Sequence, residues 1–127
     1  FVGGCELSGC NFTKANVSKS CFRENLLVDA IFDFALLDEA DFSSSELKNA
    51  SFQGASAYRT QFMASSCKNT NFNAINLMEG SMYKAYAVGA DFSNANLYCV
   101  NFLDSTLGQN KYKGANLDQT ILKDWRP

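Results

Sequence analysis

Apolar residues recur along this chain with a strict period of five. Counting from Val2, every fifth position is apolar as far as Leu122, and nine of the eleven phenylalanines belong to this series of central residues. The residue two positions before each central residue is usually small, and is most often Ala, Ser, Thr, Gly or Cys. The intervening residue is often Asn, Asp or Ser, as in Ala40-Asp41-Phe42. The register never slips.

A period of five matches neither the 3.6-residue turn of an α-helix nor the two-residue alternation of a simple strand. It predicts a chain that turns a corner once in every unit, with one large and one small side chain pointing inward and the others pointing outward. Five of the eight glycines lie two positions after a central residue, at the predicted corner, where the conformational freedom of glycine helps: Gly4, Gly9, Gly54, Gly89 and Gly114.

A longer period, equal to four of these units, supports this interpretation. Central residues four units apart share a size class, and one series is aromatic throughout: Phe12, Phe32, Phe52, Phe72, Phe92 and Tyr112. Four units per coil would place each series in one stack, on one wall of a square tube. Stacked coils lie about one strand spacing apart, ~4.8 Å, so about six coils would form a rod roughly 30 Å long.

With its units in register over essentially its whole length, the sequence resembles the pentapeptide-repeat proteins. The resemblance implies an all-β fold, a right-handed quadrilateral parallel β-helix with four five-residue units per coil. Members of this family are usually non-catalytic and bind other macromolecules. Some resemble DNA in shape and charge and bind type II topoisomerases, and others occur in cyanobacteria, in plastid lumens or as domains of secreted bacterial effectors. The fold does not choose among these roles.

The length of 127 residues fits a single domain, residues 1–127. Because the chain starts at Phe1 rather than Met, we expect it to be a domain excised from a longer protein or a processed product. Repeat rods need capped ends. Trp125 falls on a normally small inward site and is predicted to fold over the last coil as a lid.

The composition argues against catalysis. The chain has no histidine, which excludes Ser-His-Asp, Cys-His and His-metal chemistry. A filled convex rod also offers no cleft that would shift the pKa values of its carboxylates. We therefore expect no enzyme, with no catalytic residue, no cofactor and no metal. The uninterrupted apolar runs are too short to span a bilayer.

The five cysteines are assigned by their place in the repeat. Cys5 and Cys10 occupy small inward positions, Cys67 is a central core residue, and Cys21 and Cys99 should point outward. No two cysteines are separated by one full coil of four units, so disulfides between adjacent coils are not predicted. Buried thiols used as small apolar residues favour a reducing compartment such as the cytoplasm.

The net charge of −2 conceals an uneven distribution. Residues 24–46 contain seven acids and no base, whereas the remainder has 6 acids and 11 bases. Apolar residues also stand at outward positions in the same part of the chain. The candidate surface comprises Leu26, Asp29, Ile31, Asp33, Phe34, Leu36, Asp38 and Glu39. A docking surface and a solvated face with tolerated apolar residues are equal alternatives here.

A second candidate surface lies just after the central residues of later units. Tyr58, Met78 and Tyr98 are expected one above another, and the neighbouring wall carries Met63, Tyr83 and Leu103 at the same three levels. We expect these side chains to form one apolar strip around a corner, which is typical of an interface. The alternative is that the corner residues pack on each other.

These observations favour a non-catalytic β-helical scaffold that binds another protein through its outward surfaces. One alternative is a DNA-mimicking regulator of a type II topoisomerase, which needs continuous negative charge along the rod, whereas the acids here are confined to about one coil. Another is an architectural spacer in a multidomain protein such as a secreted effector. The near-neutral charge gives no argument for binding nucleic acid. Exposed ladder edges at the rod ends also allow a homodimer.

Overall fold

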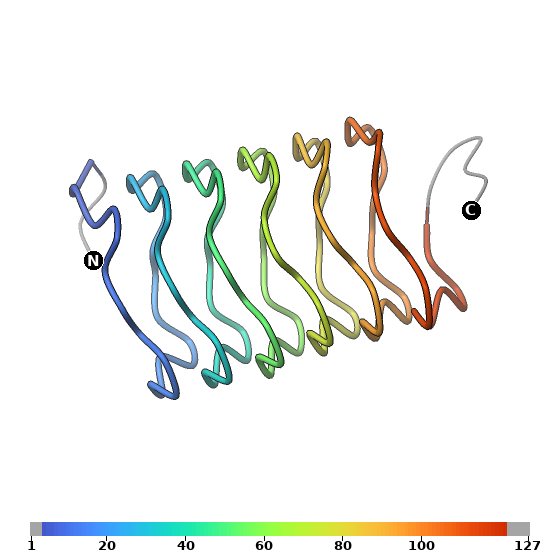
Figure 1. The fold of residues 1–127 in the computed structure, drawn as a ribbon, viewed down its shortest axis with the longest axis horizontal. Helices are drawn as coiled ribbons and strands as arrows, with labels where there is room; N and C mark the ends of the chain where they lie inside the picture. The colour runs from blue at the N-terminus through green and yellow to red at the C-terminus, as the bar shows by residue number, and fades with distance from the viewer. Residues whose placement is uncertain (1–3, 122–127) are drawn as a thin grey trace.

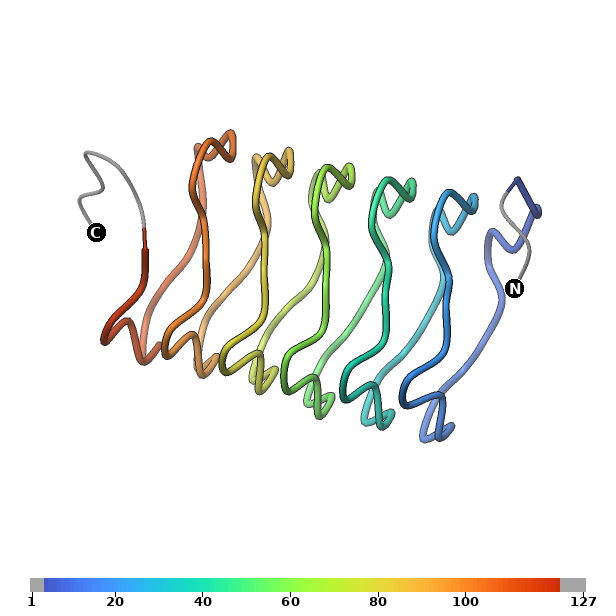
Figure 2. The same cartoon turned by 180° about the vertical axis from the view of Figure 1, so that it is seen from behind.

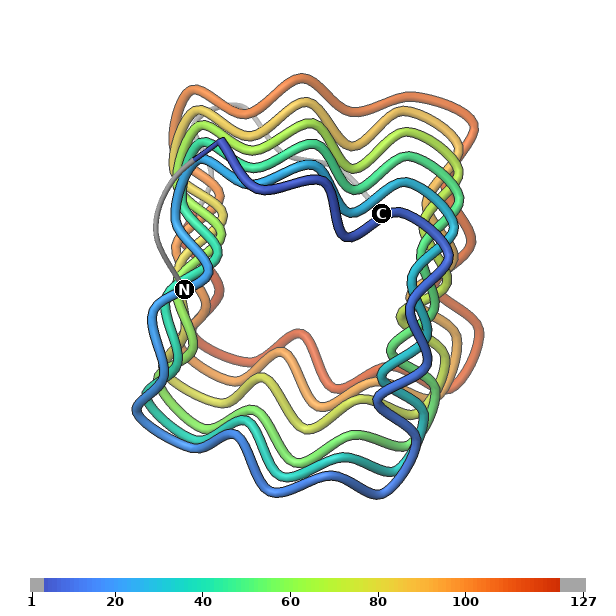
Figure 3. The ribbon, with the colours of Figure 1, turned by 90° about the vertical axis from the view of Figure 1, so that its left-hand side faces the viewer.

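A computed structural model describes residues 4–121 as a regular stack of coils that progresses along one axis (Figures 1 and 2). Viewed end-on, each coil has a four-sided outline (Figure 3). The described residues contain no helix and no strand longer than a single bridging residue. Instead, parallel bridges join residues that are four units apart, from Glu6↔Leu26 to Asn101↔Ile121. The predicted period of four units is therefore the repeat of the coil.

The four walls of the coil are called the Leu7, Phe12, Val17 and Phe22 walls, in chain order. Each name is that of the first described central residue that points from the wall into the interior of the tube. Backbone hydrogen bonds hold successive coils together along every wall. In the Phe12 wall, for example, the amide of Phe32 donates to the carbonyl of Ser51 at 2.7 Å, and the amide of Ser51 donates back to the carbonyl of Ala30 at 3.0 Å.

The corners of the coils contain residues in the left-handed backbone conformation. Among residues 4–121, nineteen residues with this conformation are not glycine, with φ between 54° and 62°, and Gly4, Gly9, Gly54, Gly89 and Gly114 complete the set. Most corners are also closed by a hydrogen bond between backbone groups. The amide of the small inward residue after the corner donates to the carbonyl of the central residue before it, as Ala35 does to Phe32 at 3.1 Å. A positive φ at the third position of such a turn is the requirement of a type II turn. The glycines thus mark a conformation that most other units adopt without glycine.

The lumen is filled by the central residues. From Phe22 to Phe102, all of them are at most 2% exposed. Phenylalanines stack along a wall, as Phe32 does on Phe52 with ring centroids 5.0 Å apart. Rings of the Phe12 and Phe22 walls meet edge-to-face across the lumen, as Phe32 and Phe42 do at 5.1 Å. Each fully buried side chain contributes roughly 1.5–3 kcal/mol, and the aromatic pairs add to this.

Polar residues at the small inward positions are mostly hydrogen-bonded to turn carbonyls. Thr60 donates to the carbonyl of Leu37 and Thr70 to that of Leu47, both at 2.8 Å. Asn25 is the exception: its Oδ1 accepts from the amide of Cys5, but its Nδ2 is buried without a partner. The predicted core residues Val2 and Leu122 and the predicted lid Trp125 lie outside the described residues.

Two cysteines have the exposure that the repeat predicts, since Cys67 is fully buried and Cys21 is exposed. Cys5 and Cys10, expected inward, and Cys99, expected outward, are all half-buried, and none of the five cysteines forms a disulfide. Burial raises the pKa of the Cys67 thiol to about 12, although the thiol lies 3.1 Å from the Ser65 hydroxyl. Such a thiol is a packing residue and is chemically inert.

Candidate interaction surfaces

The outward position in the middle of each wall often has a structural role of its own. Its side chain often accepts a hydrogen bond from the amide two positions later, and this local bond satisfies an amide that no ladder bond uses. Asn71 accepts from Asn73 at 2.9 Å, and Asp91 accepts from Ser93 at 2.9 Å. This explains why the intervening residue of the repeat is so often Asn, Asp or Ser.

The Val17 wall shows this mid-wall position most clearly. Bridges place Asn16, Leu36, Ser56, Asn76, Asn96 and Asn116 in one column. Asn96 accepts from the amide of Tyr98 at 3.2 Å, and its Nδ2 donates to the Oδ1 of Asn76 at 3.1 Å. Asn116 donates to Asn96 in the same way at 3.3 Å. Leu36 interrupts a column whose other members are polar.

Three consecutive units carry an apolar residue at this position. Leu26, Ile31 and Leu36 stand mid-wall on the Leu7, Phe12 and Val17 walls of the coil of residues 24–43. Leu26 is 43% exposed and Leu36 is 47% exposed, whereas Ile31 is half-buried. A hydrocarbon side chain cannot accept a hydrogen bond. The fold therefore gains no local amide bond from these three residues.

Phe34 stands at the corner between the Phe12 and Val17 walls and is 53% exposed. Its ring covers the backbone of Gly54 on the next coil, because a Cβ built at Gly54 would lie only 2.6 Å from the Phe34 Cε1. Ile31, Phe34 and Leu36 together form the corner patch, which wraps one corner at a single level of the rod. Leu26 lies outside this patch, one wall earlier.

Four acids of the same coil divide into two groups, Asp33 with Asp38 and Asp29 with Glu39. Asp33 accepts from the Ser51 hydroxyl and from the amide of Gln53, and Asp38 accepts from the Ser56 hydroxyl and from the amide of Tyr58. These two aspartates replace the mid-wall acceptor for the next coil. Sequence reasoning missed this role. Asp33 and Ser51 are 18 residues apart, as are Asp38 and Ser56, which is two residues short of one coil, and this shared spacing is the signal that could have revealed it.

The second group of acids projects outward and has no such role. Asp29 and Glu39 are exposed. Within residues 4–121, the only ion pair joins Arg59 Nη2 to Glu79 Oε1 at 3.4 Å. None of the acids of the 24–43 coil therefore forms an ion pair with a base in this part of the chain.

The second predicted surface differs from expectation in its arrangement. The amide of Thr60 donates to the carbonyl of Ala57 and closes one corner turn, and the amide of Ser65 donates to the carbonyl of Phe62 and closes the next. Tyr58 and Met63 therefore lie at two successive corners. The prediction of one strip around a single corner is wrong. A polar column on the Phe22 wall separates the two apolar columns, and consists of Gln61, Ser81 and Asn101. The structure places Tyr58, Met78 and Tyr98 on one side of it and Met63, Tyr83 and Leu103 on the other.

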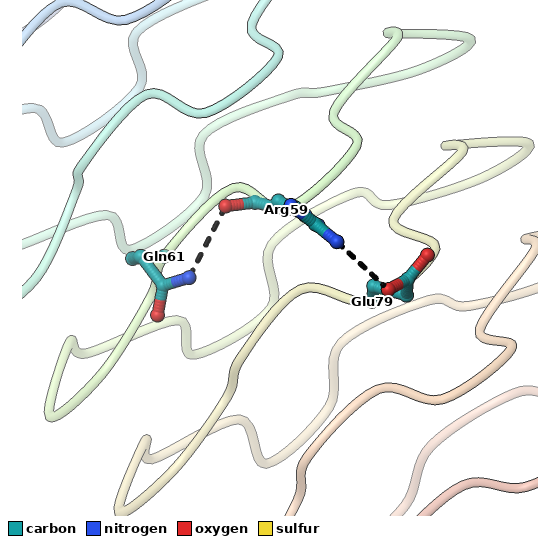
Figure 4. Close-up of polar contacts among 3 residues, drawn as sticks. All are labelled: Arg59, Gln61 and Glu79. Carbon is teal, nitrogen blue, oxygen red and sulfur yellow. Dashed lines mark hydrogen bonds and ion pairs between the residues drawn. The ribbon is translucent and has the colours of Figure 1, made fainter.

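Several side chains of these columns already contact charged neighbours. Arg59 lies over the Tyr58 ring at 5.1 Å, and Lys84 lies over the Tyr83 ring at 5.3 Å. A hydrogen bond to the Glu79 carboxylate raises the pKa of the Tyr58 phenol. Figure 4 shows the same Arg59 linking Glu79 on one side and Gln61 on the other, where Gln61 Nε2 donates to the Arg59 carbonyl at 3.1 Å.

The apolar columns are also less exposed than the sequence suggests. Met63 is 37% exposed, and the other five members are half-buried. A hydrogen bond to the Cys99 thiol raises the pKa of Tyr98. These corner residues pack on neighbours to a considerable degree, which was the alternative interpretation of the pattern.

The described residues offer little for other kinds of site. In this part of the chain, no three His, Cys, Asp or Glu side chains are grouped so that they would hold a metal ion. No helix of sufficient length and apolarity to cross a bilayer occurs among residues 4–121.

Comparison with known proteins agrees with this geometry. Residues 2–24, 26–62 and 81–109 match the family model described as pentapeptide repeats, in 8 copies. The chain belongs to the pentapeptide repeat family. Comparison with curated proteins returns no match.

Solved structures of the same fold are also similar. Rfr23, a pentapeptide repeat protein from the cyanobacterium Cyanothece 51142, is 20% identical with a TM-score of 0.67, over 93% of this chain and 91% of that one. A trypsin-treated variant of QnrB1, a plasmid-mediated fluoroquinolone resistance protein, is 21% identical with a TM-score of 0.57, over 94% and 68%. At these identities the likeness establishes the fold alone, and the fold is the predicted right-handed quadrilateral β-helix.

Proposed function

We propose that this chain is a non-catalytic β-helical module that binds another protein, and that the corner patch of Ile31, Phe34 and Leu36 is its principal contact surface. The observation that carries the proposal is the departure of Ile31 and Leu36 from the polar mid-wall position. Both positions hold Asn or Ser in the coils above and below. Residues that break a local pattern of the fold are expected at functional sites.

A DNA-mimicking role is less well supported. Such a protein needs negative charge that continues along the rod axis, but the acids here encircle a single coil. Along the corner between the Val17 and Phe22 walls, the charge alternates through Lys19, Glu39, Arg59 and Glu79. The likeness to QnrB1 concerns the fold, so it supplies no argument for a shared target. An architectural spacer would have no need of an apolar corner.

A photo-crosslinker tests the proposal directly. p-Benzoylphenylalanine replaces Phe34 in one variant and Asn94, three coils further along the same corner, in a matched control. Irradiation in an extract of the source organism should give a discrete protein adduct from position 34 and none from position 94. Adding Leu36→Asn to the first variant should remove the adduct. Equal adducts from both positions, or none from position 34, would refute the assignment.

A further inference from the structure

We propose that the corner patch binds a segment of the partner in which basic and apolar side chains alternate, and that this segment crosses the rod axis instead of following it. This inference rests on the proposed function and specifies the chemistry of the partner. Three features carry it: the order of side chains on the coil, their charge, and the charges of the neighbouring coils.

Acidic and apolar side chains are interspersed on the outside of this coil around the corner patch. From residue 29 to residue 39, in chain order, they are Asp29, Ile31, Asp33, Phe34, Leu36, Asp38 and Glu39. Ile31 and Leu36 lie mid-wall on adjacent walls, and Phe34 lies at the corner between them. A partner that follows this order must place apolar groups on the three apolar side chains and cationic groups on the acids between and beside them. The contacts lie at one level of the rod, so the bound segment runs around the corner.

The acids beside the patch are held in place but are not neutralised. Hydrogen bonds from Ser51 and Ser56 fix the Asp33 and Asp38 carboxylates against the next coil, and no base of the described chain forms an ion pair with either one. An apolar partner without cations would cover these charges and leave them unpaired, which is costly. Lysine or arginine side chains would pair with them.

The charges of the preceding coil favour this orientation of the segment. Lys14 precedes Phe34 in its corner column, and Lys19 precedes Glu39 in the next corner column. A basic segment laid along the axis would meet these lysines, whereas one that crosses the axis meets only the acids of the 24–43 coil. The same acids repel the phosphates of nucleic acids and anionic lipids.

Fluorescence anisotropy with short labelled peptides tests the inference. The probe alternates lysine and leucine, one control peptide replaces its lysines by glutamate, and another replaces its leucines by serine. The lysine–leucine peptide should bind the wild-type chain saturably and more weakly as salt increases, and neither control peptide should bind comparably. Loss of the half-exposed Leu36 surface in Leu36→Asn should weaken binding about tenfold.

Charge variants separate the contributions further. The double variant Asp29→Asn, Glu39→Gln removes two exposed acids that lie beside the patch, and should reduce both the affinity and its salt dependence. The exposed acid Asp104 lies on another corner, so Asp104→Asn should change neither. Equal binding of the serine peptide, unchanged binding to Leu36→Asn, or no peptide binding would overturn the inference. A specific adduct from position 34 together with any of these results would leave the proposed function standing and remove only the assigned chemistry.

Discussion

Leu36 and Leu37 are adjacent residues for which the structure predicts opposite responses to the same substitution. Leu36 is 47% exposed at a mid-wall position, whereas Leu37 is 0% exposed in the lumen. Asparagine occupies the mid-wall position of the Leu36 column at Asn16, Asn76 and Asn96. We therefore expect Leu36→Asn to be tolerated and Leu37→Asn to be strongly destabilising.

The magnitudes follow from burial and hydrogen bonding. Leu37→Asn removes a fully buried side chain, at a cost of roughly 1.5–3 kcal/mol, and leaves a buried amide group unsatisfied, at a further cost of roughly 1–3 kcal/mol. The free energy of unfolding should fall by about 4 kcal/mol in total. Leu36→Asn loses about half of a leucine burial, about 1 kcal/mol. It regains about the same from a bond with the Asp38 amide, so the net change is close to zero.

Urea unfolding followed by circular dichroism measures both variants. The midpoint of Leu36→Asn should stay near that of the wild-type chain, and the midpoint of Leu37→Asn should move to a much lower urea concentration at an unchanged slope. Similar losses in the two variants would refute the assignment of Leu36 to the outer surface and Leu37 to the lumen. A loss above about 2 kcal/mol in Leu36→Asn would show that the fold itself needs this leucine, which would remove the main support for a functional corner patch.

Two further predictions follow from the corners and the core. Gly9→Ala and Gly54→Ala place the same methyl group on a left-handed backbone, and each should lower the free energy of unfolding by about 1–2 kcal/mol. Only Gly54→Ala displaces the Phe34 ring, so this variant alone should weaken binding of the lysine–leucine peptide, and an equal effect of Gly9→Ala would contradict this role of Phe34. Burial raises the pKa of Cys67 from 9.0 to about 12, so the folded chain retains a proton that the unfolded chain releases, and the free energy of unfolding should fall as pH rises from about 9 toward 12. Cys67→Ala should lack this component, and a constant difference between the two chains across that pH range, in urea titrations at each pH, would contradict it.

The spacing of the sequence was sufficient to predict the lumen. The period of five depends only on which side chains can point inward, and each described central residue from Phe22 to Phe102 is buried. The grouping by four units predicted which rings stack, as with Phe12 on Phe32 at 4.8 Å. These features were predictable because burial of apolar surface imposes the same demand on every unit.

The corner conformation was only partly predictable. Glycines indicated where the chain turns, but lysine, glutamate and phenylalanine adopt the same positive φ at Lys19, Glu39 and Phe34. A left-handed conformation costs a non-glycine residue about 1–2 kcal/mol, so sequence propensity gives no warning of it. The ladder bond that the corner amide makes offsets this cost, as from Phe34 to the carbonyl of Gln53 at 2.8 Å.

The outer surfaces were least predictable because their roles depend on contacts between coils. Asp33 and Asp38 were interpreted as surface charge, yet their carboxylates take over an acceptor role for Ser51 and Ser56. The sequence pattern predicts the Tyr58 and Met63 columns around one corner. It does not show that residues five positions apart are separated by a full wall of the coil. Only the coil geometry supplies that separation.

The two candidate surfaces differ in what their apolar residues imply. The position after each central residue, occupied by Tyr58 and Met78, contributes its amide to the local bond, and this works with any side chain. Tyrosine or methionine there violates no requirement of the fold and carries little information about function. The mid-wall position often supplies the acceptor of that bond, and Leu26, Ile31 and Leu36 cannot supply it on three consecutive walls. Because three consecutive walls of the 24–43 coil carry apolar side chains at a position that is usually polar, this coil is where a partner best explains the sequence.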